Sequence, residues 1–268
     1  MQRDTTTFSG SIPEHYDAGM GPFVFVDYAD DIARRAAALK PARLLETAAG
    51  TGIVSRRLRD RLPAATHLTS TDFSPEMLEV ARAKFKPTEQ VAFQPADATA
   101  LPFGDASFDI VVCQFGVMFY PDKDKSYREV HRVLAPGGHY LFNVWDAHRY
   151  NPFGRIAHET AGRFFPDDPP QFLSIPFNYA FDSIRDSLIA ARFGDITAHI
   201  VRFEKDVGDA TGLARGITFG SPLIDQIRAR GGVEPEQVFE TILANYRREF
   251  GNPGKMPLQA TVFSARKA

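Results

Sequence analysis

The chain has 268 residues, of which 44% are hydrophobic and 24% are charged, a composition that is ordinary for a globular protein. Its net charge of −2 argues against binding to nucleic acid through a broad basic face, because neutralising phosphates requires clustered Lys and Arg. The single cysteine, Cys113, excludes a disulfide framework within the chain and fits a reducing cytoplasm.

The chain also lacks the usual signals for export or membrane insertion. Met1 is followed by polar residues, not by a basic and then an apolar segment, so we expect no signal peptide. No apolar run approaches the roughly 20 residues that a membrane helix requires. We therefore expect a cytoplasmic protein without a membrane span.

The first 145 residues predict a helical segment followed by alternating strands and helices. Residues 13–38 have a helical pattern with a break at Gly19-Met20-Gly21-Pro22. Strands are then expected near 43–48, 67–73, 91–97, 108–115 and 138–145, with helices near 52–62, 74–85 and 123–134. Regular alternation of this kind predicts a parallel sheet with helices on both faces, the doubly wound α/β class.

The alternation breaks after Trp145, where two stretches resemble insertions. Residues 146–180 are rich in proline and aromatic side chains, and residues 208–256 hold another predicted helix after Pro235. Between and after them we expect helices at 153–165 and 182–193 and strands at 196–205 and 258–265. The predicted organisation is one domain over 1–268, with an N-terminal helical segment (1–40), a core (41–145) and helical cap insertions at 146–180 and 208–256.

The most distinctive motif is a glycine turn between a predicted buried strand and a predicted helix. The strand ends at Glu46, the turn reads Thr47-Ala48-Ala49-Gly50-Thr51-Gly52, and the helical pattern begins at Ile53. Glycine lets the backbone approach a ligand closely, because no Cβ stands in the way. This turn therefore predicts a floor for a nucleotide-like ligand, although glycines can also serve a tight turn alone.

Two acids and a helix-to-strand turn sharpen this prediction. Asp72 ends the second strand, about 20 residues past the glycines, where an acid can accept hydrogen bonds from both ribose hydroxyls. Asp97 and Ala98 end the third strand, where a carboxylate can accept from an adenine amino group. Residues 132–138 then lead through Pro136-Gly137-Gly138 into the fifth strand.

Together these motifs resemble the class I S-adenosylmethionine-dependent methyltransferases, in the branch that contains ubiquinone/menaquinone C-methyltransferases and many small-molecule methyltransferases. The resemblance is strong over residues 40–145, and elsewhere it extends only to the expected arrangement of helices and strands. It implies a Rossmann-like, doubly wound sheet of seven strands, mostly parallel, with an antiparallel C-terminal strand. It also implies S-adenosyl-L-methionine as cofactor and S-adenosyl-L-homocysteine as product, with residues 41–145 as the cofactor-binding core.

The resemblance implies a role for each matching residue. Glu46 corresponds to the acid near the methionine amino group, and Asp72 to the ribose acid. The methionine part would lie over Gly50 and Gly52, while Ala48 stands where the family often has another glycine. The remaining cofactor contacts would come from Phe73 or Met77 against adenine, Asp97 and Ala98 at its amino group, and Gln114 and Phe115 at the end of the fourth strand.

A general base is required only if the methyl acceptor must lose a proton. By their location, the candidates are His15, Tyr16, His148 and Tyr150. No spacing of histidines or cysteines matches a metal site, so we predict no metal.

The predicted acceptor is a small or medium, largely apolar molecule. The fourth strand ends in Gln114-Phe115-Gly116, unlike the Asn- or Asp-Pro-Pro-Tyr/Phe loop of methyltransferases that act on amino groups of bases or glutamine. With the slight negative charge, this disfavours nucleic acid as a partner. Phe115, Met118, Phe119, Trp145 and the cap phenylalanines suit a quinone precursor, polyketide, terpenoid, indole-derived or lipid-like metabolite. The sequence leaves the oligomeric state open.

Two other functions share part of this pattern. A nicotinamide-dependent oxidoreductase has the same strand-turn-helix and ribose acid, but here Ser55 stands where a Gly-x-Gly-x-x-Gly motif has its third glycine. A non-catalytic module that binds S-adenosylmethionine would keep the fold and the acids without turnover.

Overall fold

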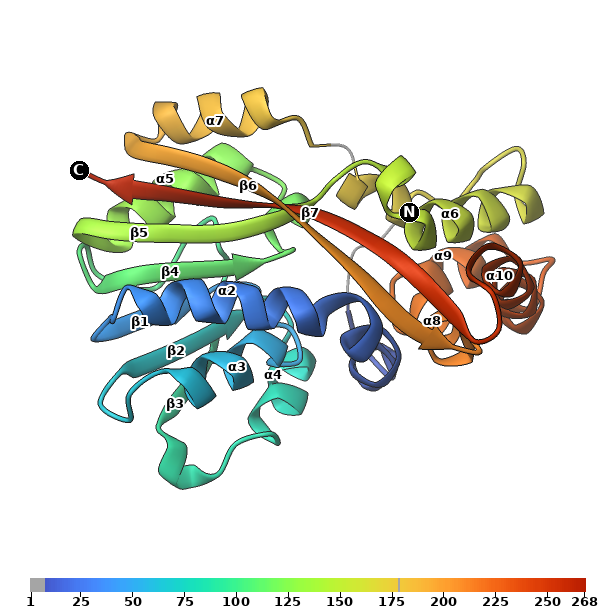
Figure 1. Ribbon diagram of the computed structural model, residues 1–268, viewed down its shortest axis with the longest axis horizontal. Coiled ribbons are helices and arrows are strands. Elements are labelled where there is room, and N and C mark those ends of the chain that lie inside the picture. The colour runs from blue at the N-terminus through green and yellow to red at the C-terminus, as the bar shows by residue number, and fades with distance from the viewer. Residues whose placement is uncertain (1–7, 178) are drawn as a thin grey trace. The chain divides into compact units, whose positions relative to one another are not determined.

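The computed structural model describes residues 8–177 and 179–268 (Figure 1). Its strands are β1 (Arg43–Glu46), β2 (His67–Asp72), β3 (Val91–Pro95), β4 (Phe108–Gln114), β5 (Leu134–Trp145), β6 (Phe193–Gly208) and β7 (Gly254–Lys267). Its α-helices are α1 (Ile12–His15), α2 (Val26–Ala38), α3 (Ile53–Arg61), α4 (Pro75–Arg82), α5 (Lys123–Val133), α6 (Pro152–Phe164), α7 (Phe181–Ala190), α8 (Thr211–Phe219), α9 (Leu223–Arg230) and α10 (Pro235–Phe250). The π-helix η1 (Tyr16–Phe25) lies between α1 and α2, and the short 3-10 helices are η2 (Pro87–Glu89), η3 (Val117–Phe119), η4 (His148–Tyr150) and η5 (Phe172–Phe177).

The described residues divide into two compact units, each built from three segments of the chain. The first unit comprises residues 8–25, 145–177 and 202–259, and the second comprises residues 26–144, 179–201 and 260–268. The expected division into a core with two cap insertions stays a prediction, and residues 1–7 of the predicted N-terminal segment lie outside the described residues. No helix in the described part of the chain is long and apolar enough to cross a membrane.

The sheet has seven strands in the order β3-β2-β1-β4-β5-β7-β6 (Figure 1). Strand β1 pairs in parallel with β2 on one side and with β4 on the other, so the direction of winding reverses at β1. Pairs β2–β3 and β4–β5 are also parallel, and the C-terminal strands run antiparallel. The predicted Rossmann-like fold class is confirmed. In such sheets a ligand binds at the carboxyl ends of the strands beside the reversal.

Alternating side chains of β5 show how the second unit buries both faces of its sheet. Leu141 belongs to an apolar cluster with residues of α2 and α3, whereas Tyr140 and Phe142 face the other way and contact Tyr127 of α5. Phe142 also stacks on Phe263 of β7, with ring centroids 5.0 Å apart. Neighbouring residues of a strand point to opposite faces, so one strand supports two cores. Helices on both faces hold the strand ends in fixed positions.

The first unit is mostly helical, and two pairs of its elements approach closely at glycines. A Cβ built on Gly19 of η1 would lie 2.5 Å from the Cα of Gly216 in α8, which no side chain tolerates. A Cβ built on Gly154 of α6 would lie 2.3 Å from the ring of Phe177 in η5. Both contacts require glycine because the approach is too close for any Cβ.

Three expectations about the helices and strands were wrong. The expected break at residues 19–22 is absent, because the helical path continues through η1 with Pro22 inside it. The wide turn of a π-helix and the contact of Gly19 with α8 accommodate residues that would interrupt an ordinary α-helix. Sequence analysis also missed α8 and α9, and it placed the strand of residues 196–205 too narrowly, since β6 spans Phe193–Gly208.

Candidate functional site

The turn after β1 adopts the backbone conformation that its glycines predict. Ala48, Gly50 and Gly52 all have positive φ, at 52°, 54° and 77°. A Cβ on Gly52 would lie 2.8 Å from the Cβ of Ala81 in α4, whereas a Cβ on Gly50 would meet no atom within 4 Å. Gly52 therefore serves close packing, and Gly50 borders open space. The turn forms the kind of floor that a ligand requires.

The turn is tied to the strands on both sides of β1. The backbone N–H of Thr47 donates to Val112 of β4, and that of Ala49 donates to Thr71 of β2, each at 2.9 Å. A Cβ on Gly116, just past β4, would lie 2.3 Å from the Cβ of Ala48. Gly116 therefore leaves the room that the Ala48 methyl group occupies.

Asp72, at the end of β2, is positioned by backbone donors. The N–H of Gly50 donates to Oδ2 at 2.8 Å, and the N–H of Ser74 donates to Oδ1 at 2.9 Å. Burial raises the pKa of the Asp72 carboxyl, and these backbone hydrogen bonds oppose that rise. The backbone N–H of Phe73 is a third donor to this carboxylate, whose two oxygens offer about four lone-pair sites. Asp72 therefore retains the capacity to accept from a ligand hydroxyl, as a ribose presents it.

The two candidates for packing on adenine differ in exposure. The Phe73 side chain is 79% exposed beside Asp72, whereas Met77 in the first turn of α4 is only 3% exposed. An aromatic ring that is this open to solvent can stack on a flat base. Of the two, Phe73 is the better placed for that role.

Asp97 lies past the end of β3 in a local turn. Its Oδ1 accepts from the backbone N–H of Thr99 at 2.7 Å and from the Thr99 hydroxyl at 2.8 Å. The Asp97 side chain is exposed, and Ala98 is buried. The turn thus fixes the carboxylate while leaving it open to a ligand.

Glu46, at the end of β1, is almost fully buried beneath the turn, with 1% exposure. The hydroxyls of Ser55 in α3 and Ser70 in β2 donate to its Oε2, at 2.5 and 3.1 Å. Burial raises the pKa of Glu46 to about 8, although the two serine hydrogen bonds lower it. Glu46 therefore carries a proton at neutral pH in the free protein, and a nearby cation would favour its ionised form.

Gln114 ends β4, which pairs with β1, and Phe115 directly follows it. Phe115 has a positive φ of 53°, and its N–H donates to Oδ1 of Asn143 at 2.9 Å. Gln114 pairs with Asn143 in the β4–β5 register. Sequence analysis missed Asn143, as it missed Ser55 and Ser70 as partners of Glu46. A polar residue inside the apolar run Leu141-Phe142-Asn143-Val144 was the signal that could have found it.

The four candidate bases all belong to the first unit, whereas the predicted cofactor contacts all belong to the second. Burial lowers the pKa of His148, so its ring is neutral at pH 7. Its Nε2 lies 2.9 Å from the carbonyl oxygen of Leu173, which can only accept. The proton therefore sits on Nε2, and Nδ1 carries the lone pair of a base.

The other three candidates have less distinctive surroundings. Tyr16 stacks on Phe25 with ring centroids 5.0 Å apart, and the ring of His15 lies 6.0 Å from that of Phe219. Tyr150 is 37% exposed beneath the Arg149 guanidinium. The described residues contain no group of three or more His, Cys, Asp or Glu that could hold a metal ion, and the predicted absence of a metal stays a prediction.

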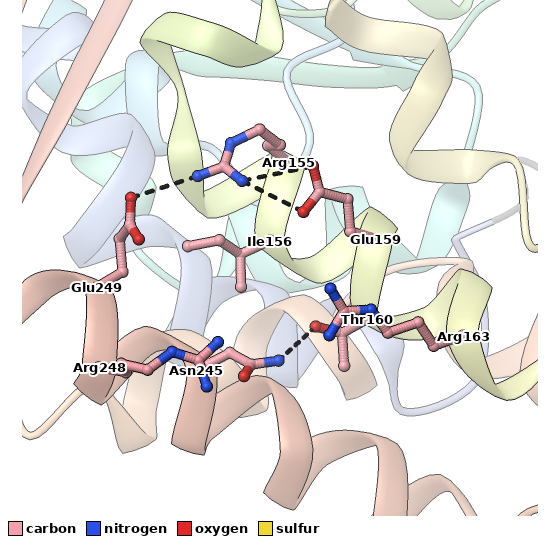
Figure 2. Close-up of a pocket in the computed structure, with 8 residues that line it drawn as sticks. All are labelled: Arg155, Ile156, Glu159, Thr160, Arg163, Asn245, Arg248 and Glu249. Carbon is pink, nitrogen blue, oxygen red and sulfur yellow. Dashed lines mark hydrogen bonds and ion pairs between the residues drawn. The ribbon is translucent and has the colours of Figure 1, made fainter.

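A pocket in the first unit lies between α6 and α10 and contains none of the predicted site residues (Figure 2). Arg155 of α6 forms an ion pair with Glu159 of the same helix at 3.2 Å and another with Glu249 of α10 at 3.3 Å, and the second pair joins the two helices. The Asn245 amide donates to the Thr160 hydroxyl at 2.8 Å (Figure 2). We interpret this pocket as a polar contact between helices.

The second unit therefore gathers its candidate residues where a nucleoside with an amino-acid tail would fit. Glu46, Asp72 and Gln114 end neighbouring parallel strands, and Asp97 follows the next strand along. The open space at Gly50 and the remaining acceptor capacity of Asp72 fit S-adenosylmethionine. When bound, that cofactor supplies an activated methyl group.

Comparison with known proteins agrees with this geometry. Residues 45–142 match the family described as "Methyltransferase domain". A demethylmenaquinone methyltransferase of Thermus thermophilus is 44% identical over 99 residues, which cover 37% of this chain and 44% of that protein. A malonyl-[acyl-carrier protein] O-methyltransferase of Geobacter sulfurreducens is 28% identical over 232 residues, which cover 84% of this chain and 82% of that protein.

A solved structure shows the same fold. It is a Haemonchus contortus phosphoethanolamine N-methyltransferase 2 in complex with S-adenosylhomocysteine, with a TM-score of 0.61 and 16% identity. The alignment covers 95% of this chain and 57% of that one.

The fold is that of a doubly wound α/β protein, a class whose members bind nucleotides at the carboxyl ends of the strands, where this chain has its acids. The match over residues 45–142 points to a narrower class: this part of the chain is similar to the methyltransferase domain of class I S-adenosylmethionine-dependent enzymes, among them the quinone C-methyltransferases, and the similarity supports S-adenosylmethionine as the cofactor. The match favours a methyl donor over the nicotinamide-dependent alternative. The chain spans less than half the length of the demethylmenaquinone methyltransferase that it resembles.

Proposed function

We propose that this protein transfers a methyl group from S-adenosylmethionine to a small or medium, largely apolar metabolite. The acceptor classes are a quinone precursor, polyketide, terpenoid, indole-derived or lipid-like compound. Names of the similar proteins, a demethylmenaquinone methyltransferase among them, support a small-molecule acceptor. We place the protein in the cytoplasm, and we propose no nucleic-acid partner.

In the proposed site, Asp72 accepts from the ribose hydroxyls, Phe73 stacks on adenine and Asp97 accepts from its amino group. Glu46 faces the charged methionine end across the turn, while Gly50 and Gly52 allow close approach. Gln114 and Phe115 border the reacting carbon. Fixing donor and acceptor in this way lowers the barrier by several kcal/mol, because orientation is achieved on binding.

An aromatic cluster in the first unit is the main support for a largely apolar methyl acceptor. Trp145 lies edge-on to Phe153 with centroids 5.4 Å apart, and Phe177 contacts both. The neutral ring of His148 lies 4.4 Å from Phe177. Aromatic side chains favour flat, apolar ligands. For an acceptor that must lose a proton, we propose Nδ1 of His148 as the base.

A second candidate acceptor is the free carboxylate of an acyl thioester, which would become a methyl ester. The relative named malonyl-[acyl-carrier protein] O-methyltransferase aligns over 84% of the chain, a span that includes much of the first unit.

The test is a methyl-transfer assay with S-adenosylmethionine, read by mass spectrometry over a panel of acceptors. The panel holds demethylated quinones, phenolic polyketides, indoles, terpenoids, a malonyl thioester, bulk tRNA and a protein extract. We expect mass gain of one methyl group on an apolar small molecule. Transfer to tRNA or protein alone would overturn the proposed acceptor class, and transfer to the thioester alone would favour the second candidate.

A further inference from the structure

The residue directly after β4 has an unusual backbone conformation. Phe115 has a φ of 53°, in the left-handed region that a bulky side chain rarely adopts. Such conformations persist only where neighbouring groups hold them, and they gather at functional sites. Phe115 directly follows Gln114, the last residue of β4, so the strained position lies at the carboxyl edge of the sheet.

The group that holds the Phe115 backbone is Asn143 of β5. The Phe115 N–H donates to the Asn143 side-chain Oδ1 at 2.9 Å and to the Asn143 backbone carbonyl at 3.3 Å. Because an N–H can only donate, the amide oxygen must face Phe115, and this fixes the orientation of the side chain.

Stability alone does not explain why an amide stands at this position. Asn143 is completely buried, and its Nδ2 finds no acceptor among the described residues. A buried donor without a partner is unfavourable. The benefit of Asn143 therefore lies in its oxygen, which contacts Phe115.

The ring of Phe115 is held as well. Tyr28 of α2 is fully buried and meets Phe115 edge-on, with ring centroids 5.3 Å apart. The Tyr28 hydroxyl donates to the carbonyl of Val201 at 3.3 Å, which fixes the tyrosine in turn. The backbone and the ring of Phe115 are thus constrained from two different elements of the second unit.

We propose that Asn143 is a positioning residue for methyl transfer: its side-chain oxygen holds Phe115 in the left-handed conformation and thereby sets Gln114 and Phe115 against the cofactor. The inference rests on the proposed role of Gln114 and Phe115 in the site. Asn143 itself touches neither cofactor nor acceptor and acts through Phe115.

The test is a calorimetric titration of S-adenosylhomocysteine into four proteins: wild type, N143L, F115G and the double variant. Leucine has the shape of asparagine but offers no acceptor. We expect N143L to weaken binding by about tenfold, the scale of loss that small misplacements produce. Glycine adopts positive φ freely, so in the F115G background N143L should change affinity less than about twofold.

Two further variants separate positioning from folding. N143D, studied near pH 6 where a buried carboxyl stays protonated, keeps an acceptor oxygen in the same shape and should bind nearly as wild type does. N245L removes another buried amide, in α10, and should leave the affinity unchanged. We expect N143L to melt within a few degrees of wild type, because it also removes the unpaired donor.

Equal losses from N143L in both backgrounds, or wild-type affinity in N143L, would overturn the proposal. If N143L failed to fold, wild-type affinity in F115G together with a loss in N143D would overturn it. If Q114A and F115G both bound like the wild type, the site assignment under the proposed function would fail instead.

Discussion

At the scale of single residues, Ala48 stands at a position of the turn whose backbone conformation favours glycine. Its φ of 52° costs an alanine about 1–2 kcal/mol, whereas glycine adopts it freely. A48G should therefore leave the free energy of unfolding unchanged or raise it by up to about 1 kcal/mol, because glycine's greater entropy in the unfolded chain offsets part of the gain. Urea denaturation measures this.

The matched control for A48G is A33G, in the middle of α2, where the alanine is fully buried in a helix. Glycine there should cost about 1 kcal/mol or more. A loss in A48G as large as that in A33G would show that the left-handed strain is not relieved.

Glu46 predicts how stability depends on pH. Its pKa in the folded protein is about 8, against an ordinary value of 4.5, so the favourable contribution of the protonated carboxyl is complete below about pH 4.5 and is lost as the pH rises through about 8. Relative to E46Q, which cannot ionise, wild type should lose about 1–3 kcal/mol of unfolding free energy between about pH 5 and pH 8.

Urea unfolding of wild type and E46Q at several pH values makes this comparison. Parallel pH profiles for the two proteins would mean that Glu46 is already ionised at pH 5 in the folded state, contrary to the effect of its burial.

At the scale of elements, the aromatic cluster of the first unit gives a prediction about acceptor use. Phe177 of η5 packs over Gly154 of α6 and contacts Trp145 and His148, all within that unit. F177A should raise the KM for the acceptor by about tenfold, the scale of a lost apolar contact, and leave S-adenosylhomocysteine affinity within about twofold.

F181A is the control for F177A, because Phe181 is a partly exposed ring on α7 in the second unit. Steady-state kinetics and calorimetry on both variants separate acceptor from cofactor effects. Equal losses of acceptor use and cofactor affinity in F177A would make the cluster structural.

The strands that carry the site could be predicted because each has a local signal. Apolar runs that end in Glu46 and Gln114 indicate buried parallel strands, and the β-branched segment that ends in Asp72 favours a strand as well. The predicted bounds lie within a few residues of β1, β2 and β4. Side-chain partners have no such signal. In the sequence, Ser55 was noted only because it stands where a Gly-x-Gly-x-x-Gly motif has its third glycine. In the structure, its hydroxyl donates a hydrogen bond to Glu46, nine residues away. That contact depends on how α3 packs.

The helix η1 was harder to predict, again because it depends on contacts that have no local signal in the sequence. In η1, Gly19 and Pro22 usually interrupt a helix, and only the contact with Gly216 of α8 explains their place. That contact joins residues that are far apart in sequence, so local propensity gives no indication of it.

At the scale of the whole molecule, the proposed cofactor contacts lie in one unit and the candidate bases in the other. Hydrogen–deuterium exchange should therefore show that S-adenosylhomocysteine protects backbone amides of the second unit, near Gly50, Ser74, Thr99 and Phe115. Ligand binding stabilises the region that it contacts by mass action. Protection concentrated in α6, η5 and α10 would place the cofactor elsewhere.

The most direct test of the account is a calorimetric titration of S-adenosylhomocysteine into wild type and D72A, with D60A as a surface control. Asp72 is proposed to accept from the ribose, whereas Asp60 forms an exposed ion pair with Arg56 in α3. We expect saturable binding to wild type and D60A, and a loss of about 1–3 kcal/mol in D72A because polar partners are left unpaired. No binding to folded wild type, or equal affinity in D72A, would contradict the account.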